Sequence, residues 1–186
     1  DSATVNVSDS VLSVGLVINL TVTPVNDAPV ITQGNGPLSY SLNEDSNFSF
    51  DLNATDLEGD VLTWSIASDP TNGTATVTAA TGTVTYIPTT NFEGNDSLTL
   101  TVSDSNLSDS VVVNLAVNGV NDAPSSISNL SALSFSENLV LGSSIGTFSA
   151  TDPDMGDLIT FSLFDNDQST DSHLFSIDSN GTLRTA

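Results

Sequence analysis

Apolar and polar residues alternate with a period of two along most of the chain. Between residues 38 and 117 the alternation occurs in seven short runs, each closed by Gly, Pro, Asn or Asp. Because successive side chains of a strand point to opposite faces, each run predicts a half-buried β-strand. The predicted strands span 38–42, 48–52, 62–66, 74–78, 83–87, 98–102 and 111–117. No segment has a 3.6-residue apolar period over helical length, so the pattern predicts an all-β fold.

Seven short strands in roughly 95 residues are typical of a Greek-key β-sandwich with an immunoglobulin-like arrangement. The chain contains no cysteine, so no disulfide joins the two sheets. Trp64 lies in the third run and is expected to anchor the core. The sequence therefore predicts a sandwich held by apolar packing and backbone hydrogen bonds.

The same sandwich is expected to recur along the chain. The pentapeptide Val-Asn-Asp-Ala-Pro occurs at 25–29 and again at 120–124, and an ungapped offset of 95 residues matches 18 of the 29 positions between 1–29 and 96–124. Repetition at a fixed offset indicates tandem structural units. The predicted divisions are the closing strands of a truncated repeat (1–24), a linker (25–29), a complete repeat (30–119), a second linker (120–124) and the first part of a third repeat (125–186).

The two flanking segments carry their own strand signals. Residues 4–7 and 16–22 alternate around the turn Ser8-Asp9-Ser10, which predicts an antiparallel hairpin. The third repeat predicts strands at 130–135, 145–150, 158–164, 174–177 and from 182 onward. Two interpretations of the hairpin remain open. In the first, the chain is a segment of a longer array of repeats. In the second, the hairpin of one subunit completes the last repeat of the next subunit in a head-to-tail fibre.

The net charge of the chain excludes some classes of binding partner. The chain has 23 acidic residues and a single basic one, Arg184, for a net charge of −22. Nucleic acids and anionic membrane surfaces are therefore poor partners, and cations are the expected ones. No apolar run reaches transmembrane length, so no membrane insertion is expected within this chain.

The acids gather in turns near the joints between repeats. Asp152 and Asp154 stand two residues apart before Gly156, and Asp56 and Glu58 do so before a glycine in the second repeat. Carboxylates at this spacing on a loop present hard oxygens to one point, as calcium requires. The alternative is that these turns are solvated caps without a metal.

The order of these motifs resembles the cadherin family. In the third repeat, Ser136-Glu137-Asn138, Ile145-Gly146-Thr147, the segment 150–157, Phe175 to Asp178 and Gly181-Thr182-Leu183 follow one another as in a cadherin repeat. The second repeat, with Asn-Phe-Glu-Gly-Asn-Asp-Ser at 91–97 and the Asn-Asp-Ala-Pro linkers, is similar to cadherin-like tandem repeats of large bacterial adhesins and other exported surface proteins.

The resemblance implies calcium between successive repeats. At the second junction the implied ligands are Glu44, Glu93, Asn121, Asp122, Asp152 and Asp154. At the first junction they are Asn26, Asp27, Asp56 and Glu58. Glu137 would serve a later junction. Thr23 and Asn118 stand where cadherin linkers carry an Asp, which implies fewer ions or weaker binding at each junction.

The sequence thus favours a calcium-stiffened structural or adhesive repeat region of a secreted or cell-surface protein. A carbohydrate-binding or cell-binding module and a strand-donating fibre subunit are the alternatives. No enzymatic activity is expected, because the lone His173 has no plausible base or nucleophile partner. The loop acids Asp165, Asp167 and Asp171 are expected to be solvated.

Overall fold

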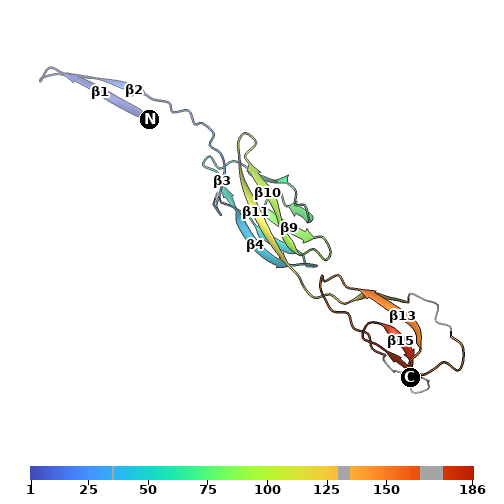
Figure 1. Cartoon of the computed structure of the whole chain (residues 1–186). Helices are drawn as coiled ribbons and strands as arrows, with labels where there is room; N and C mark the ends of the chain where they lie inside the picture. The colour runs from blue at the N-terminus through green and yellow to red at the C-terminus, as the bar shows by residue number, and fades with distance from the viewer. Residues whose placement is uncertain (35, 130–134, 164–173) are drawn as a thin grey trace.

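The computed structural model describes residues 1–34, 36–129, 135–163 and 174–186, and it is an all-β chain. A hairpin, a complete unit and a third unit follow one another along an elongated molecule (Figure 1). His173, the loop acids at 165, 167 and 171, and most of the strand expected at 130–135 lie outside the described residues. Within the described part, no helix has the length and apolar character needed to cross a membrane.

The complete unit contains the strands β3 to β11. Their bounds are β3 Val30–Ile31, β4 Leu38–Asn43, β5 Phe48–Asp51, β6 Ala54–Thr55, β7 Thr63–Ser68, β8 Gly73–Val77, β9 Thr83–Pro88, β10 Gly94–Ser103 and β11 Ser108–Asn118. One sheet has the order β4-β11-β10-β7, and the other has the order β5-β9-β8 with the short pair β3-β6 beside it. Each predicted run therefore forms a strand, and the predicted β-sandwich is confirmed. The two-residue strands β3 and β6 are additional.

The core lies between these two sheets. The inward positions of β10 and β11 are apolar and alternate with polar outward positions, so Leu100, Val102 and Val113 are fully buried. Trp64 is 5% exposed and belongs to the same cluster, as its place in the third run predicts. Truncating a buried leucine such as Leu100 to alanine typically costs about 2–5 kcal/mol.

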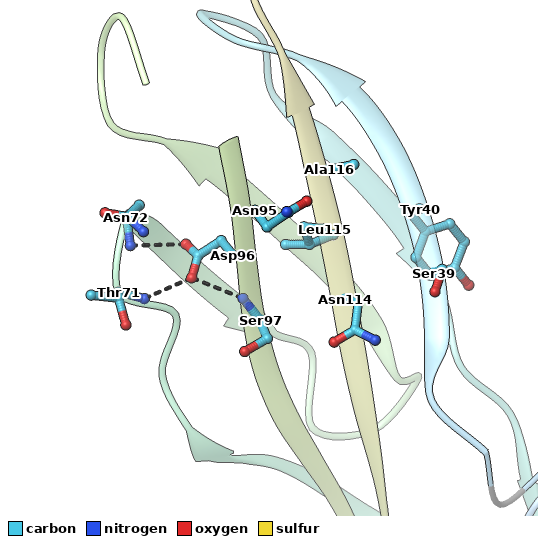
Figure 2. A pocket seen from close by; sticks show the side chains of 10 residues that line it. All are labelled: Ser39, Tyr40, Thr71, Asn72, Asn95, Asp96, Ser97, Asn114, Leu115 and Ala116. Atoms are coloured by element: carbon cyan, nitrogen blue, oxygen red, sulfur yellow. Dashed lines mark hydrogen bonds between the residues drawn. The ribbon is translucent and has the colours of Figure 1, made fainter. Parts of the chain in front are cut away.

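One buried carboxylate joins the sheets. Asp96, on β10, accepts hydrogen bonds from the backbone N–H groups of Thr71 at 2.9 Å, Asn72 at 2.8 Å and Ser97 at 2.8 Å (Figure 2). The Tyr86 hydroxyl of β9 donates a further bond to it at 2.9 Å. Burial opposes the charged form of Asp96, but the hydrogen bonds outweigh burial and the pKa of this carboxyl is lowered.

The N-terminal hairpin repeats the closing strands of the complete unit. β1 (Ser2–Ser8) and β2 (Ser13–Asn19) pair antiparallel, from Ser2 opposite Asn19 to Ser8 opposite Ser13. Each of these pairs recurs 95 residues later between β10 and β11. Every residue of both hairpin strands is nevertheless exposed.

The third unit forms one sheet in place of two. Its strands are β12 Ser125–Asn129, β13 Ser144–Thr151, β14 Phe175–Ile177 and β15 Thr182–Thr185, in the order β12-β13-β15-β14. This sheet corresponds to β3-β6 joined to β5-β9-β8. Among the described residues, all fully buried apolar side chains lie between residues 29 and 117, and none lies in the third unit.

One strand prediction for the third unit is wrong. The strand β12, which pairs with β13 directly after the linker, is an additional one, and the strand expected at 130–135 stays a prediction. Residues 158–163 form no strand despite their alternating pattern. In the complete unit the equivalent strand, β7, pairs only with β10. Among the described residues of the third unit, no strand pairs with residues 158–163 as β10 pairs with β7.

Candidate metal centre

The second linker brings acids of two units together. The Asp122 backbone N–H donates to Asp154 Oδ2 at 2.6 Å, and the Asp154 N–H donates to Asp152 Oδ1 at 3.0 Å. The linker is thereby tied to the acidic turn of the third unit. The side chain of Asn121 is exposed and donates to the Asp122 carbonyl at 2.8 Å.

The complete unit supplies two glutamates to the same place. Glu44 is 5% exposed, and its Oε1 accepts from the Val120 N–H at 2.8 Å. Gly119 lies between the glutamates: a Cβ there would stand 2.9 Å from Glu93 Oε2 and 3.7 Å from Glu44 Oε1. Glycine at this position therefore allows the Glu93 carboxylate to approach the linker backbone, whereas the distance to Glu44 is an ordinary van der Waals contact.

These contacts converge on a small space. One carboxylate oxygen from each of Glu44, Asp122 and Asp154 lies within 4.8 Å of the other two, and Asp152, Asp154 and Asp157 form a second such group. The pKa of Asp122 is raised by desolvation first, and then by the charges of Asp45, Asp154, Glu44 and Asp152. Like charges at this separation repel one another unless a cation lies between them.

Two acids near this cluster are not among the ligands that the resemblance implies. Asp45 adds to the negative potential at Asp122, and its Oδ1 accepts from the Asn91 N–H at 3.2 Å. Asp157 completes the second carboxylate group. Both stand within or next to the acidic motifs, but spacing alone does not show that their turns bend back toward the linker.

No Lys or Arg side chain among the described residues neutralises this cluster. The single Lys or Arg residue of the chain is Arg184, whose Nε donates to Asp178 Oδ2 at 2.8 Å within the third unit. The excess negative charge at the second junction must therefore be balanced by ions from solution.

The first linker repeats the backbone pattern of the second. The Asp27 N–H donates to Glu58 Oε2 at 3.1 Å, and the Glu58 N–H donates to Asp56 Oδ1 at 3.1 Å. Asp56 Oδ2 is buried and has no hydrogen-bond partner. Within the described residues no third carboxylate from the preceding hairpin joins this group.

Asn26 has a different environment from its counterpart Asn121. Its Nδ2 donates to Asp104 Oδ2 at 2.8 Å, at the turn between β10 and β11. Asp104 also accepts from the backbone N–H groups of Asn106 and Leu107, both at 2.7 Å. The Asn26 amide nitrogen therefore fastens the first linker to its own unit.

A shallow groove of about 630 Å³ lies on the sheet that contains β4, β11 and β10 (Figure 2). Ser39, Asn95 and Asn114 are among its lining residues, and Tyr40 is the aromatic one. The Tyr40 ring stacks on Phe50 with their centroids 4.5 Å apart. Because this ring packs within the protein, the groove has no free aromatic platform for stacking on a sugar.

Comparisons with known proteins agree with this architecture. Residues 26–116 match the family model described as a bacterial Ig domain. Two crystal forms of human protocadherin-24 EC1-2 share 25% and 28% sequence identity with the chain, at TM-scores of 0.57 and 0.59. The matches cover 87% and 86% of this chain and 78% and 80% of those chains.

Drosophila N-cadherin EC1-4 has a TM-score of 0.54 at 22% identity, covering 86% of this chain and 41% of that one. No curated protein sequence matches the chain. The resemblance drawn from the sequence motifs is confirmed at the level of fold. Residues 26–116 are thus similar to a bacterial Ig domain, and the chain has the β-sandwich fold of cadherin ectodomains.

Proposed function

We propose that this chain is a calcium-stiffened spacer or adhesive segment of a secreted or cell-surface protein. The observation that carries the proposal is the group formed by Glu44, Asp122 and Asp154, three carboxylates from the two units and the linker within 4.8 Å. With Arg184 engaged elsewhere, the protein has no Lys or Arg to offset them.

The donor set fits calcium better than other common metals. It consists of carboxylate and carbonyl oxygens, with no cysteine, and calcium takes six to eight such ligands at about 2.3–2.6 Å with tolerant geometry. At the first junction, Asp56 Oδ2 is buried and has no hydrogen-bond partner. A buried carboxylate oxygen without a donor is costly, and a cation would satisfy it.

In this mechanism two kinds of interaction hold the joint between the complete unit and the third unit. Backbone N–H groups of the linker donate to Glu44 and Asp154, which sets the direction in which the linker leaves the complete unit and enters the third. Glu44, Asp122 and Asp154 would hold a cation, which would supply the positive charge that this cluster lacks. Without it, mutual repulsion favours opening of the joint. The proposed set comprises Glu44, Glu93, Asn121, Asp122, Asp152 and Asp154, with Asp45 and Asp157 adjacent.

The first junction is proposed as a weaker site. Asp27, Asp56 and Glu58 lie together there, but the described hairpin contributes no acid, and the Asn26 amide nitrogen is engaged with Asp104. Fewer charged ligands give lower calcium affinity. We therefore expect the second junction to fill at lower calcium concentration than the first.

Native mass spectrometry and thermal melting test this proposal. We expect calcium to bind the intact chain and raise its melting temperature, and excess chelator to reverse both effects. Magnesium at equal concentration serves as the control, since it requires near-octahedral geometry and loses its waters reluctantly. Melting curves that are the same in calcium and in chelator would refute the proposal.

The similar proteins also bear on where the chain is located and on whether it is an enzyme. Cadherin-like and bacterial Ig repeats are typical of exported proteins, so we propose an extracellular or cell-surface location and expect no catalytic activity. Surface labelling of intact cells with an antibody against the complete unit would test the location. A signal seen only after permeabilisation would contradict it.

A further inference from the structure

We propose that the groove on the outer face of β4, β11 and β10 binds an uncharged oligosaccharide through hydrogen bonds alone. The groove has a volume of about 630 Å³, within the range of ligand sites in proteins. The inference does not depend on calcium, because none of the lining residues belongs to the proposed calcium sites.

The groove lies over two neighbouring rows of side chains that point away from the core. In one row, Ser97 of β10 stands opposite Asn114 of β11, which pairs in turn with Ser39 of β4. In the next row, Asn95 stands opposite Ala116. Figure 2 shows these residues following one another across the three strands. Because the side chain of Ala116 is a single methyl group, the space between the two longer amides stays open.

The turn between β7 and β8 forms one end of the groove and is fixed in place. The backbone N–H groups of Thr71 and Asn72 donate to the buried Asp96 carboxylate at 2.9 and 2.8 Å (Figure 2). The Asn72 carbonyl accepts from the Thr89 N–H at 2.8 Å. These bonds occupy backbone groups of the turn and leave its two side chains free to contact a ligand. A wall that is already ordered lowers the entropic cost of binding.

The polar side chains in the groove differ from others on the same sheet. Outside the groove, the hydroxyls of Thr101 and Ser110 bond each other at 2.9 Å, and Asn118 Nδ2 donates to Ser41 Oγ at 2.9 Å. Within the part of the chain that the structure describes, the groove side chains make no such bonds: Ser39, Thr71, Asn72, Asn95, Ser97 and Asn114. Each amide and each hydroxyl offers both donors and acceptors. Sugar hydroxyls, which also donate and accept, match this set.

The chemistry of the lining disfavours charged ligands. Asp96 is its only Asp, Glu, Lys, Arg or His residue, and that carboxylate is 7% exposed and already accepts four hydrogen bonds. No free charge is therefore offered to a phosphate, a carboxylate or an ammonium group. The net charge of −22 also repels acidic polysaccharides.

The usual modes of peptide recognition do not fit the groove either. Its centre lies on β11, which pairs with β4 on one side and β10 on the other, so no backbone edge is open there to an added strand. Proline-rich segments dock on aromatic grooves and amphipathic helices on apolar ones. The Tyr40 ring packs on Phe50, and the side chains that face the groove are polar or small. An uncharged polyhydroxylated ligand is the class that remains.

Nuclear magnetic resonance titration of the isotope-labelled chain tests the proposal. The probes are uncharged cello-, manno-, xylo- and malto-oligosaccharides at about 10 mM, because hydrogen bonds without ring stacking give dissociation constants near 1 mM. We expect at least one probe to shift the backbone amide signals of Asn95, Asn114 and Ala116, equally in calcium and in chelator. A calcium site that fails its own test would leave this result unchanged.

Two other probes distinguish the ligand class. Oligogalacturonate has similar hydroxyls but carries carboxylates, so it should shift these signals less than the uncharged sugars do. An uncharged Gly-Ser peptide should leave them in place. The proposal is overturned if no uncharged sugar shifts the three signals, if the peptide alone shifts them, or if oligogalacturonate binds as well as the uncharged sugars.

Variants on β11 then locate the site. Asn114→Ala removes a groove amide, and we expect the affinity for the sugar to fall about fivefold. Ser110→Ala is the matched control, because Ser110 is exposed on the same face of β11 but lies outside the groove, and it should change the affinity by less than about twofold. Ala116→Leu keeps every hydrogen-bonding side chain but fills the open space, so binding should weaken by more than about tenfold. Unchanged melting temperatures would show that the variants fold. Native affinity in Ala116→Leu would contradict the assignment of the groove.

Discussion

Replacing Glu44 with glutamine removes one charge from the second junction while keeping the shape of the side chain. The amide oxygen of Glu44→Gln can still accept the hydrogen bond from the Val120 N–H, which is 2.8 Å long in the native protein. The main change is therefore electrostatic. In chelator, the variant should be as stable as the native chain or more stable.

The separation of the carboxylates sets the size of the expected change in stability. Oxygens of Glu44 and Asp154 lie within 4.8 Å of each other. At that distance two unit charges repel by about 0.9 kcal/mol in bulk water and by about 3.5 kcal/mol at an effective dielectric constant of 20. After loss of the charge-assisted bond to Val120, we expect a net gain of about 1 kcal/mol in chelator. That gain corresponds to roughly 2–4 °C in melting temperature for a chain of this size.

Calcium should reverse which of the two proteins, native or Glu44→Gln, has the higher melting temperature. Glutamine is a weaker, uncharged ligand, so we expect calcium affinity to fall by about 10–100-fold. Each tenfold loss removes about 1.4 kcal/mol of the stabilisation produced by a saturating ligand. Native Glu44 should therefore give the higher melting temperature in calcium and the lower one in chelator.

Differential scanning calorimetry in calcium and in chelator measures both effects. Glu137→Gln is the matched control, because Glu137 occupies the same motif in the third unit and is exposed, away from the carboxylate groups at the junction. It should leave both melting temperatures unchanged. If calcium raises the melting temperature of Glu44→Gln as much as that of the native chain, the account of the second junction is refuted.

Three further predictions concern the complete unit. Asp96→Ala leaves one buried and three partly buried donors without their acceptor. It should lower the free energy of unfolding by about 3 kcal/mol, measured by urea denaturation. The pKa of Asp104 is lowered chiefly by the hydrogen bond from the Leu107 N–H. The stability that this carboxylate contributes is therefore present above its ordinary pKa near 3.8 and is lost as the pH falls further. Asp104→Asn should flatten that part of the curve of stability against pH. Gly82→Ala, at φ +72° with a carbonyl oxygen 2.5 Å from the new Cβ, should cost more than about 2 kcal/mol, whereas Gly59→Ala, at φ +80° in open space, should cost about 1 kcal/mol.

Much of the complete unit could be predicted because its strands alternate strictly. The inward apolar positions of β10 and β11 identify the core, and Trp64 lies where the pattern places it. The pair β3–β6 was missed because two residues are too short to show a period. The contacts of this pair depend on the path of the linker, and the alternation of apolar and polar residues does not determine that path.

The third unit shows where local pattern is insufficient. Residues 158–163 have the sequence of a strand, but a strand needs a partner, and the partner of the equivalent β7 is the distant β10. Alternation reports which face of a segment is apolar. It does not report whether the neighbouring strand is available.

The candidate site was only partly accessible for a similar reason. The acidic pairs flanking each linker are visible in the sequence, and Glu44, Asp122 and Asp154 do converge. The turn that brings Asp45 toward the linker, and the contact that engages Asn26 with Asp104, depend on tertiary packing. The spacing of residues along the chain does not determine either contact.

The central claim is that a cation fixes the orientation of the complete unit relative to the third. Because the chain has no cysteine, Thr76→Cys on β8 and Ser176→Cys on β14, both exposed, accept spin labels at unique positions. The distance distribution between the labels, measured by pulsed electron paramagnetic resonance, should be broad in chelator and narrow to a single peak in calcium. Adding Asp154→Asn should keep it broad in both conditions. A distribution of the same width with and without calcium would contradict the account.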